Sequence, residues 1–327
     1  MSDDIFLSII IPVYNMEKYI GDCIKSLEQQ HFEDDVEIIL VNDGSTDKSF
    51  DIMKKYQDHS RNVFIINQLN SGVAAARNEG LAKAKGKYVA WIDPDDYICE
   101  DWWNVLRPEL EKCPDMVYFD MYTLKDGVFR EIAFDKKTRY ISHEELCKEL
   151  AVGNRIQSHL WSKIILRSLF NKSFSTRYSY CEDFALLHHI LFYVKVCRYI
   201  HKPLYIYRQL ETSIVHDETK MLDNYRLGIS LYKKRFRFFK NNGMIVPYDG
   251  VWNAMLNYCL DYERHNRENI YIRQKNINYV CLNILRHNIF KIVSSNYFTF
   301  KHKIKFIVVT LGGVKIFNGI KKIIQID

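Results

Sequence analysis

Several features that mark other classes of protein are missing from this 327-residue sequence. The longest fully apolar run near the C-terminal end, residues 306–309, is far too short to cross a lipid bilayer. The eight cysteines form no CxxC pair, and scattered single thiols are typical of a reducing compartment. The first residues are acidic, whereas a signal peptide begins with basic ones. We therefore expect a cytoplasmic protein without a transmembrane anchor.

Sequence signatures of two further classes are also absent. No GxGxxG motif follows a predicted strand, which argues against a dinucleotide-dependent dehydrogenase. No motif of a nucleic-acid-binding fold occurs, so we expect no nucleic-acid partner. The composition, 47% apolar and 26% charged, is instead that of an ordered globular protein. The length allows two domains, or one domain with an extension.

The net charge of +6 is concentrated at the C-terminal end. Residues 286–327 contain eight basic side chains and one acid, a net charge of +7, so residues 1–285 together carry −1. Basic side chains interleaved with Phe, Ile, Tyr and Val favour peripheral contact with an anionic membrane, here its inner face. The alternative is a packed C-terminal helix whose lysines face water.

Short apolar runs alternate with helical patterns over the first 121 residues. We expect strands at 7–13, 36–41, 63–66, 88–92 and 116–121. We expect helices at 17–30, from the turn at 42–47 to residue 56, at 74–84 and at 100–112. A Ser or Thr of the turn at residues 42–47 is the expected cap of the second helix. Strands that alternate with helices at this spacing predict an α/β fold with a mostly parallel, doubly wound sheet.

The pattern loosens after residue 125. We expect helices at 142–170 and 182–195, a loop at 171–181, and strands at 196–207 broken at Pro203. From residue 218 onward only helical patterns occur, with breaks near 241–243 and Pro247. We place a domain boundary near residue 215, which divides the chain into 1–215 and a helical C-terminal region, 216–327.

Three carboxylates follow the strand at 88–92. Asp93, Asp95 and Asp96 surround Pro94, which cannot donate to a sheet and should end the strand. Ligands of α/β proteins bind beyond the carboxyl ends of the strands. Carboxylates this close repel one another unless a cation or hydrogen-bond donors share their charge, and oxygen clusters suit Mn²⁺ or Mg²⁺ held with substrate phosphates. The alternative is an acidic surface turn.

Further candidates follow the other strands. Tyr14 comes after the first strand and could stack on a nucleobase, and Asp43 ends the second strand and could accept the N–H of uracil. Asp43 could equally be a turn or capping residue. Asn70 precedes the helix that carries Arg77. Arg77 could pair with a diphosphate, or could be a solvated surface charge.

These motifs, taken in order, resemble those of the inverting family 2 glycosyltransferases, which have the A-type glycosyltransferase fold. The motifs are PVYN, NDGSTD, NSGVAAARNEG and DPDD, followed by Trp161-Ser162-Lys163 and Cys181-Glu182-Asp183-Phe184. The first four lie within residues 5–97 and are specific as an ordered set. Residues 155–216 match more loosely, and nothing after about residue 220 resembles the family.

The resemblance implies roles for individual residues. Pro12, Tyr14 and Asp43 would hold the nucleobase, Asn70 and Arg77 would lie along the ribose and diphosphate, Asp93 would approach the ribose or sugar, and Asp95 would bind the metal. Residues 1–97 would form the nucleotide-binding half of a catalytic domain, and residues 98–215 the acceptor-binding half.

Transfer from a nucleotide sugar also requires a base on the face opposite the leaving diphosphate. Asp183, in the ED pair, is the candidate base. Glu182 would position the acceptor hydroxyl or support the base, and Asp96 is assigned to the acceptor side. Trp161 could stack on an acceptor sugar, or be a core aromatic on an amphipathic helix.

Two further residues have open roles. His216 could be a second metal ligand or a phosphate donor, although a lone His is more often structural. Arg208 could line the same cleft or cap a strand.

The sequence therefore predicts an inverting glycosyltransferase. It would move a sugar from a nucleotide-sugar donor, expected to be UDP-linked, to a glycan or lipid-linked saccharide acceptor in surface polysaccharide synthesis. One alternative is a sugar nucleotidyltransferase, but that class usually has a Gly-rich, basic loop where this chain has PVYNMEKY. The other is a non-catalytic nucleotide-sugar-binding module, which would not need this set of acids.

Overall fold

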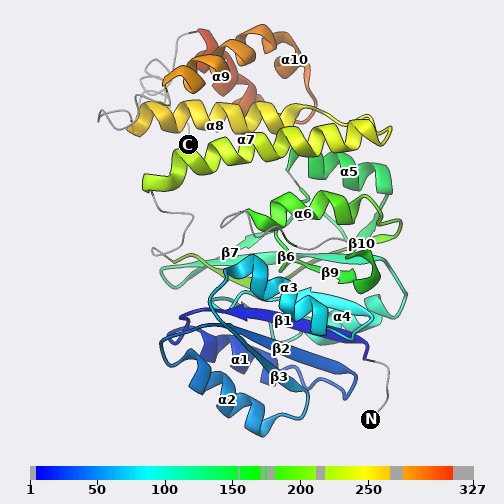
Figure 1. Ribbon diagram of the computed structural model, residues 1–327. Helices are drawn as coiled ribbons and strands as arrows, with labels where there is room; N and C mark the ends of the chain where they lie inside the picture. The colour runs from blue at the N-terminus through cyan, green and yellow to red at the C-terminus, as the bar shows by residue number, and fades with distance from the viewer. Residues whose placement is uncertain are drawn as a thin grey trace. The chain divides into compact units, whose positions relative to one another are not determined.

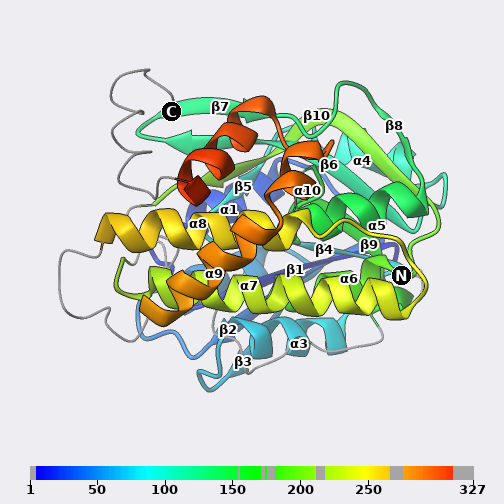
Figure 2. The same ribbon diagram turned by 90° about the horizontal axis from the view of Figure 1, so that it is seen from above.

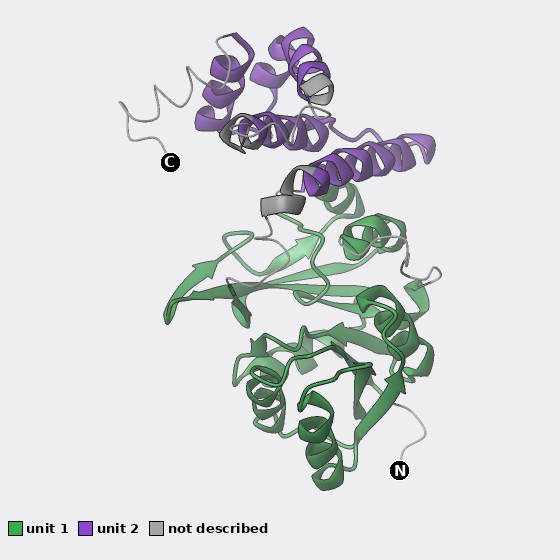
Figure 3. Ribbon diagram, turned by 60° about the vertical axis from the view of Figure 1, so that its left-hand side comes forward, with its two compact units in different colours: residues 1–150, 155–211 green, residues 151–154, 212–327 purple. Residues whose placement is uncertain are grey.

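The computed structural model describes residues 5–153, 155–170, 174, 181–210, 218–265 and 275–311. The chain divides into two compact units (Figure 3). Unit 1 comprises residues 1–150 and 155–211, and unit 2 comprises residues 151–154 and 212–327. The predicted boundary at residue 215 falls at 211–217, outside the described residues. The division into catalytic and helical domains is kept as a proposal.

Unit 1 is built on one ten-stranded sheet (Figure 1). Its strands are β1 (Leu7–Val13), β2 (Val36–Asp43), β3 (Val63–Gln68), β4 (Tyr88–Trp91), β5 (Tyr97–Ile98), β6 (Met116–Lys125), β7 (Val128–Ile132), β8 (Arg139–Ile141), β9 (Lys163–Leu166) and β10 (Cys197–Arg208). The strand order is β3-β2-β1-β4-β9-β6-β10-β5, with β7 on β6 and β8 on β10. Strands β1, β2, β3 and β4 run parallel to one another, and β6 runs parallel to β10. The predicted fold class is confirmed.

Helices cover both faces of this sheet. They are α1 (Ile20–Glu28), α2 (Ser49–His59), α3 (Val73–Lys83), α4 (Trp102–Leu110), α5 (His143–Val152) and α6 (Glu182–Leu191), with a 3₁₀ turn, η1, at Arg167–Leu169. In Figure 1, α1 and α2 lie below β1–β3, and α3 lies on the other side. Helix α3 packs closely on β1, because a Cβ added to Gly80 would lie 2.5 Å from Cγ2 of Ile10.

The strand order fixes where a ligand can bind. Strands β2 and β3 lie on one side of β1, and β4 lies on the other side. The direction of winding therefore reverses between β1 and β4, and such a reversal opens a crevice at the carboxyl ends of the strands. Tyr14, Asp43 and Asp93 all follow or end parallel strands at this edge.

Two predictions for residues 142–210 are wrong. Among the described residues of the predicted helix 142–170, the α-helix covers only 143–152 and the 3₁₀ turn η1 covers 167–169, because residues 163–166 form β9, antiparallel to both β4 and β6. A four-residue apolar strand cannot be told from a helical segment by periodicity alone. The predicted break at Pro203 is absent, since β10 continues through it with register shifts against β6. Strands β7 and β8 were not predicted.

The prediction that a Ser or Thr caps α2 is wrong, because the N-cap residue is Lys48, which makes no side-chain cap hydrogen bond. The oxygen that accepts the Ser49 N–H, at 2.9 Å, is Oδ1 of Asp47, two residues earlier. Ser45 is used elsewhere, since its Oγ accepts the N–H of Asn15 at 3.1 Å. The turn after β2 thus holds the loop after β1 in place.

Unit 2 is helical. Its helices are α7 (Glu218–Asn241), α8 (Asp249–His265), α9 (Lys275–His287) and α10 (Ile289–Ser294), followed by a helical segment at 300–311. Figure 2 shows α7 and α8 running side by side. Their core includes Met255, Tyr258, Leu285 and Phe306. The predicted break near 241–243 is confirmed, and Gly243 there has φ +77°. Within the described ranges, no helix has the length and apolar character required to cross a membrane.

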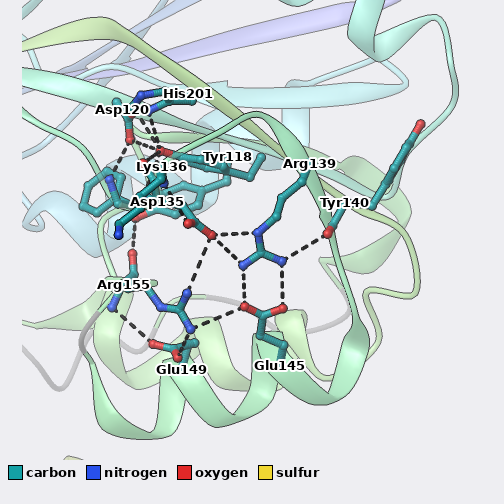
Figure 4. Close-up of polar contacts among 12 residues, drawn as sticks. Tyr118, Asp120, Asp135, Lys136, Arg139, Tyr140, Glu145, Glu149, Arg155 and His201 are labelled. Carbon is teal, nitrogen blue, oxygen red and sulfur yellow. Dashed lines mark hydrogen bonds and ion pairs between the residues drawn. The ribbon is translucent and has the colours of Figure 1, made fainter. Parts of the chain in front are cut away.

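An ion-pair network ties α5 to the loop between β7 and β8 (Figure 4). Arg139 pairs with Asp135 and Glu145, and Arg155 pairs with Glu149 at 2.6 Å. Nearby, the fully buried Asp120 accepts hydrogen bonds from Tyr199, His201 and the N–H of Phe134. Figure 4 shows Asp135 between the arginines and Asp120. The Asp135 N–H donates to the Tyr199 hydroxyl at 2.9 Å, so the two sets of contacts form one structural brace.

A buried polar network joins the amino-terminal ends of β1 and β2 to the chain that enters β4. Ser8 Oγ donates to Glu37 Oε1 at 2.6 Å, and the same oxygen accepts the Lys85 N–H at 2.6 Å. The Gly86 N–H donates to Ser8 Oγ at 2.8 Å. A Cβ at Gly86 would lie 2.4 Å from the Ser8 nitrogen, so only glycine fits where the chain enters β4.

We predict that Gly86→Ala destabilises the protein by about 1–3 kcal/mol, because the added methyl forces the backbones of β1 and β4 apart. Urea unfolding measures this. The control is Gly21→Ala in α1, where an added Cβ has no atom within 4 Å, and a gain of about 0.5 kcal/mol is expected. Equal stability of Gly86→Ala and wild type would contradict the close packing at this edge.

Candidate active site

The acidic loop, residues 93–96, is anchored from β10. The Asp93 N–H donates to the Tyr205 hydroxyl at 3.1 Å. The same hydroxyl donates to Oδ2 of Asp96 at 2.8 Å, and the Arg208 N–H donates to Oδ1 at 2.7 Å. Asp96 is only 1% exposed, so its carboxylate is a buried anchor of the loop. Its assignment to the acceptor side stays a prediction.

Asp95 carries the third carboxylate of this loop. Burial, and then the negative charge of Asp93, raise the pKa of Asp95 to about 6. A divalent cation would relieve this repulsion, and carboxylate oxygens are ligands that Mg²⁺ and Mn²⁺ accept. The loop therefore fits such an ion.

The described residues supply few ligands for that ion. Among the described residues, no group of three or more His, Cys, Asp or Glu side chains is arranged to hold a metal. Mg²⁺ is commonly held by one or two carboxylates together with substrate phosphates, which agrees with this sparse set. His216, the predicted second ligand, lies outside the described residues.

Asp43 organises the loop that leads into α3. Its Oδ1 accepts the Ser71 N–H at 2.9 Å and the side-chain amide of Gln68 at 2.7 Å, and its Oδ2 accepts the Gly72 N–H at 2.9 Å. Gly72 has φ +87°, a conformation that glycine adopts without strain. Asp43 is thus a buried loop anchor at the position predicted to meet uracil, and the uracil contact stays a prediction.

The other residues assigned to the nucleotide lie at the same edge. Tyr14 is 43% exposed, directly after β1, and Pro12 is buried within β1 opposite Val41. Asn70 is exposed in the loop before α3. The backbone of Asn70 lies so close to Gly44 that a Cβ there would meet its nitrogen at 2.7 Å. Their contacts with a nucleotide stay predictions.

Arg77 is buried and bridges two carboxylates. It is 6% exposed, and its Nη2 lies 2.9 Å from Oδ1 of Asp93, while Nη1 contacts Oε1 of Glu182. The first pair joins α3 to the acidic loop, and the second joins α3 to the start of α6. The sequence predicted both ends of this bridge as site residues but not their contact.

Asp183 lies in the first turn of α6, as predicted. It is half-buried, and its Oδ1 accepts the N–H of Phe184 at 2.6 Å. Burial raises the pKa of Asp183, and the nearby Arg77 partly offsets this. A carboxylate with a raised pKa that stays near a cation is suited to accept a proton.

Trp161 belongs to a stack of rings. Its ring centroid lies 4.6 Å from that of Tyr205, 5.7 Å from that of Tyr207 and 4.8 Å from that of His159, all nearly parallel. Trp161 is 6% exposed and lies in the turn before β9, so its placement on an amphipathic helix is wrong. Its contact with an acceptor sugar stays a prediction.

Sequence reasoning missed Tyr205 and His159. Tyr205 is both the hydroxyl that anchors the acidic loop and a member of the ring stack. The alternation of Tyr205 and Tyr207 along a strand was the available signal, because alternate residues share one face. Arg208, which was noted, pairs with Asp22 at 2.9 Å.

Residues 286–311 keep the basic and apolar mixture seen in the sequence. Phe290 and Phe300 are 88% and 77% exposed, whereas Phe306 is buried in the core of unit 2. The segment therefore packs through one set of apolar side chains and exposes another. Contact with an anionic membrane, and a cytoplasmic location, stay predictions.

Comparison with known proteins identifies the family of this chain. Residues 8–190 match glycosyl transferase family 2. The putative glycosyltransferase EpsH of Bacillus subtilis is 28% identical over 288 residues, which cover 84% of this chain and 83% of that protein. The poly(ribitol-phosphate) beta-glucosyltransferase of Bacillus spizizenii is 44% identical over 105 residues, which cover 30% of this chain and 17% of that protein.

A solved structure shows the same fold. Residues 1–349 of S. aureus TarS, in complex with UDP, superpose with a TM-score of 0.64 at 17% identity, covering 98% of this chain and 91% of that chain. The family match spans more than half of the chain, from β1 into α6, and includes the acidic loop and the ED pair. The protein is therefore a glycosyltransferase with the A-type fold, and it belongs to glycosyl transferase family 2.

Proposed function

We propose that this enzyme transfers a sugar, with inversion, from a UDP-linked donor to a saccharide or lipid-linked saccharide in the synthesis of a surface polymer. The observation that carries the proposal is the meeting, through Arg77, of the acidic loop and the ED pair at one edge of the sheet. The names of two similar proteins support the finer points. One acts on poly(ribitol phosphate), and TarS was solved with UDP.

Each residue then has a part in one displacement. The acceptor hydroxyl attacks the anomeric carbon, its oxygen forms the new glycosidic bond, and the bond to the diphosphate breaks. Asp183 takes the hydroxyl proton as the new bond forms. The start of α6 keeps the Asp183 carboxylate directed and favours its charged form. Asp95, with His216, would hold Mn²⁺ or Mg²⁺, which when bound neutralises the leaving diphosphate.

The choice of nucleotide is the first prediction of this proposal. With Tyr14 and Asp43 beside the base, UDP should raise the melting temperature, in the presence of Mn²⁺, more than GDP or CDP does. A panel of nucleotide sugars, followed by nucleotide release, should then single out UDP-linked donors. Stabilisation by GDP equal to or greater than that by UDP would rule out the uracil assignment.

The metal prediction concerns Asp95. Asp95→Asn keeps the shape of the side chain and removes the charge that faces the cation, so transfer should fall by about 10²-fold or more. Excess EDTA should abolish wild-type transfer. The control is Asp58→Asn, because Asp58 is an exposed acid of α2 that pairs with the exposed Lys54 at 3.2 Å. Undiminished transfer in EDTA would contradict a metal at the acidic loop.

The base prediction concerns Asp183. Asp183→Asn can still accept the Phe184 N–H but cannot take a proton, so turnover should fall by about 10²–10⁴ while UDP binding is retained. Asp51→Asn, the same change in the first turn of α2, is the matched control. Turnover of Asp183→Asn close to that of wild type would contradict the assignment of Asp183 as the base. The base would then move to Glu182 or Asp96.

A further inference from the structure

We propose that Arg77 is a positioning residue for the transfer reaction. Its guanidinium fixes Glu182 and, through it, the direction and charge of Asp183, rather than binding the diphosphate of the donor. The proposal rests on the assignment of Asp183 as base. It differs from the role that the sequence resemblance implies for Arg77.

The contacts of Arg77 leave little capacity for a diphosphate. One terminal nitrogen contacts Asp93 at 2.9 Å and the other contacts Glu182, and the side chain is 7% exposed. The third nitrogen, Nε, has no hydrogen-bond partner among the described residues, but it is buried, so a phosphate could reach it only if the side chains around it moved. A phosphate would have to displace a buried carboxylate from the guanidinium, and leaving a buried charge unpaired is costly. The guanidinium is therefore more suited to hold protein carboxylates than substrate.

The next residue of α3, Asn78, also joins this helix to a residue of the predicted acceptor-binding half. The Asn78 side chain donates to the Phe174 carbonyl at 3.0 Å and accepts the Phe174 N–H at 2.7 Å. Both links join α3, of the predicted nucleotide-binding half, to residues of the predicted acceptor-binding half. Helix α3 thus sets where α6 begins relative to the acidic loop.

The charges that face Asp183 come from four elements. Glu182 lies on α6 itself, Arg77 on α3, Asp93 in the acidic loop and Lys163 on β9. Burial raises the pKa of both Asp183 and Glu182, and Arg77 lowers both. Without Arg77, the buried Glu182 carboxylate and the half-buried Asp183 carboxylate would repel each other, and one would take up a proton.

Two neutral variants should therefore shift the pH dependence in opposite directions. Arg77→Gln removes the cation and raises the pKa of Asp183, so the acid limb of kcat/KM should move up by about one pH unit. Glu182→Gln removes a negative charge and keeps an oxygen for Arg77, so the acid limb should move down. In both variants, activity falls on acidification because the base becomes protonated.

The experiment measures UDP release from UDP-glucose and UDP-GlcNAc against pH, together with UDP affinity by calorimetry. UDP affinity should change by less than about threefold in both variants, whereas loss of a diphosphate ligand would cost about tenfold or more. A large loss of UDP affinity in Arg77→Gln with an unshifted acid limb would overturn the proposal. Complete loss of activity in Glu182→Gln would also overturn it, by making Glu182 the base.

Two controls separate folding from positioning. Arg107→Gln is the matched control, because Arg107 also bridges two carboxylates, those of Asp35 and Glu111, with ion pairs of 2.9 Å. Arg107 lies outside the site, so this variant should leave the acid limb unchanged. If Arg77→Gln does not fold, Arg77→Lys is measured in its place, because lysine keeps the positive charge but lacks the two terminal nitrogens that bridge Asp93 and Glu182. Turnover should then fall while the acid limb stays in place.

A double-mutant cycle of Arg77→Gln and Glu182→Gln in urea unfolding tests the bridge without catalysis. Coupling of the two effects supports the bridge, and simple additivity overturns it. Failure to turn over any UDP-linked sugar would contradict the proposed function alone, because the cycle does not depend on the donor.

Discussion

Repulsion among carboxylates at one edge of the sheet is the constraint on which the rest of the site depends. The structure handles each carboxylate of the acidic loop differently. Asp96 is buried and receives two hydrogen bonds, and Asp93 pairs with a buried guanidinium. Asp95 has no ion pair among the described residues, and burial and the charge of Asp93 raise its pKa to about 6. Burial and the charges of both neighbours raise the pKa of Asp96 well above its ordinary value in spite of its hydrogen bonds. The loop is therefore stable where it is anchored and electrostatically unsatisfied where a cation would bind.

The same edge shows how the protein joins the proposed donor site to the proposed acceptor site. The loop after β4 belongs to the parallel block of β1 to β4, whereas its anchors come from β10. Tyr205 holds the loop by its hydroxyl and stacks on Trp161 by its ring. A shift of β10 would move the acids and the stack together, so the geometry of the site depends on pairing between strands distant in sequence.

Much of the parallel block could be predicted from the sequence, and the prediction was weakest where contacts are non-local. Residues 7–13 form a strand with the predicted bounds, because a continuous apolar run matches a strand buried on both faces. Strand β9 was missed, because its four residues become a strand only between β4 and β6. The motifs indicated Arg77 and Glu182, but residues 105 positions apart carry no local sign that they pair.

The position of β9 has a consequence for synthesis of the chain. Strand β4 is completed at Trp91, yet its second neighbour in the sheet begins only at Lys163. One edge of β4 thus stays unpaired while some seventy residues are translated, and an open apolar strand edge invites pairing with other chains. Expression at low temperature or with chaperones should favour soluble protein, because it protects this edge until β9 emerges.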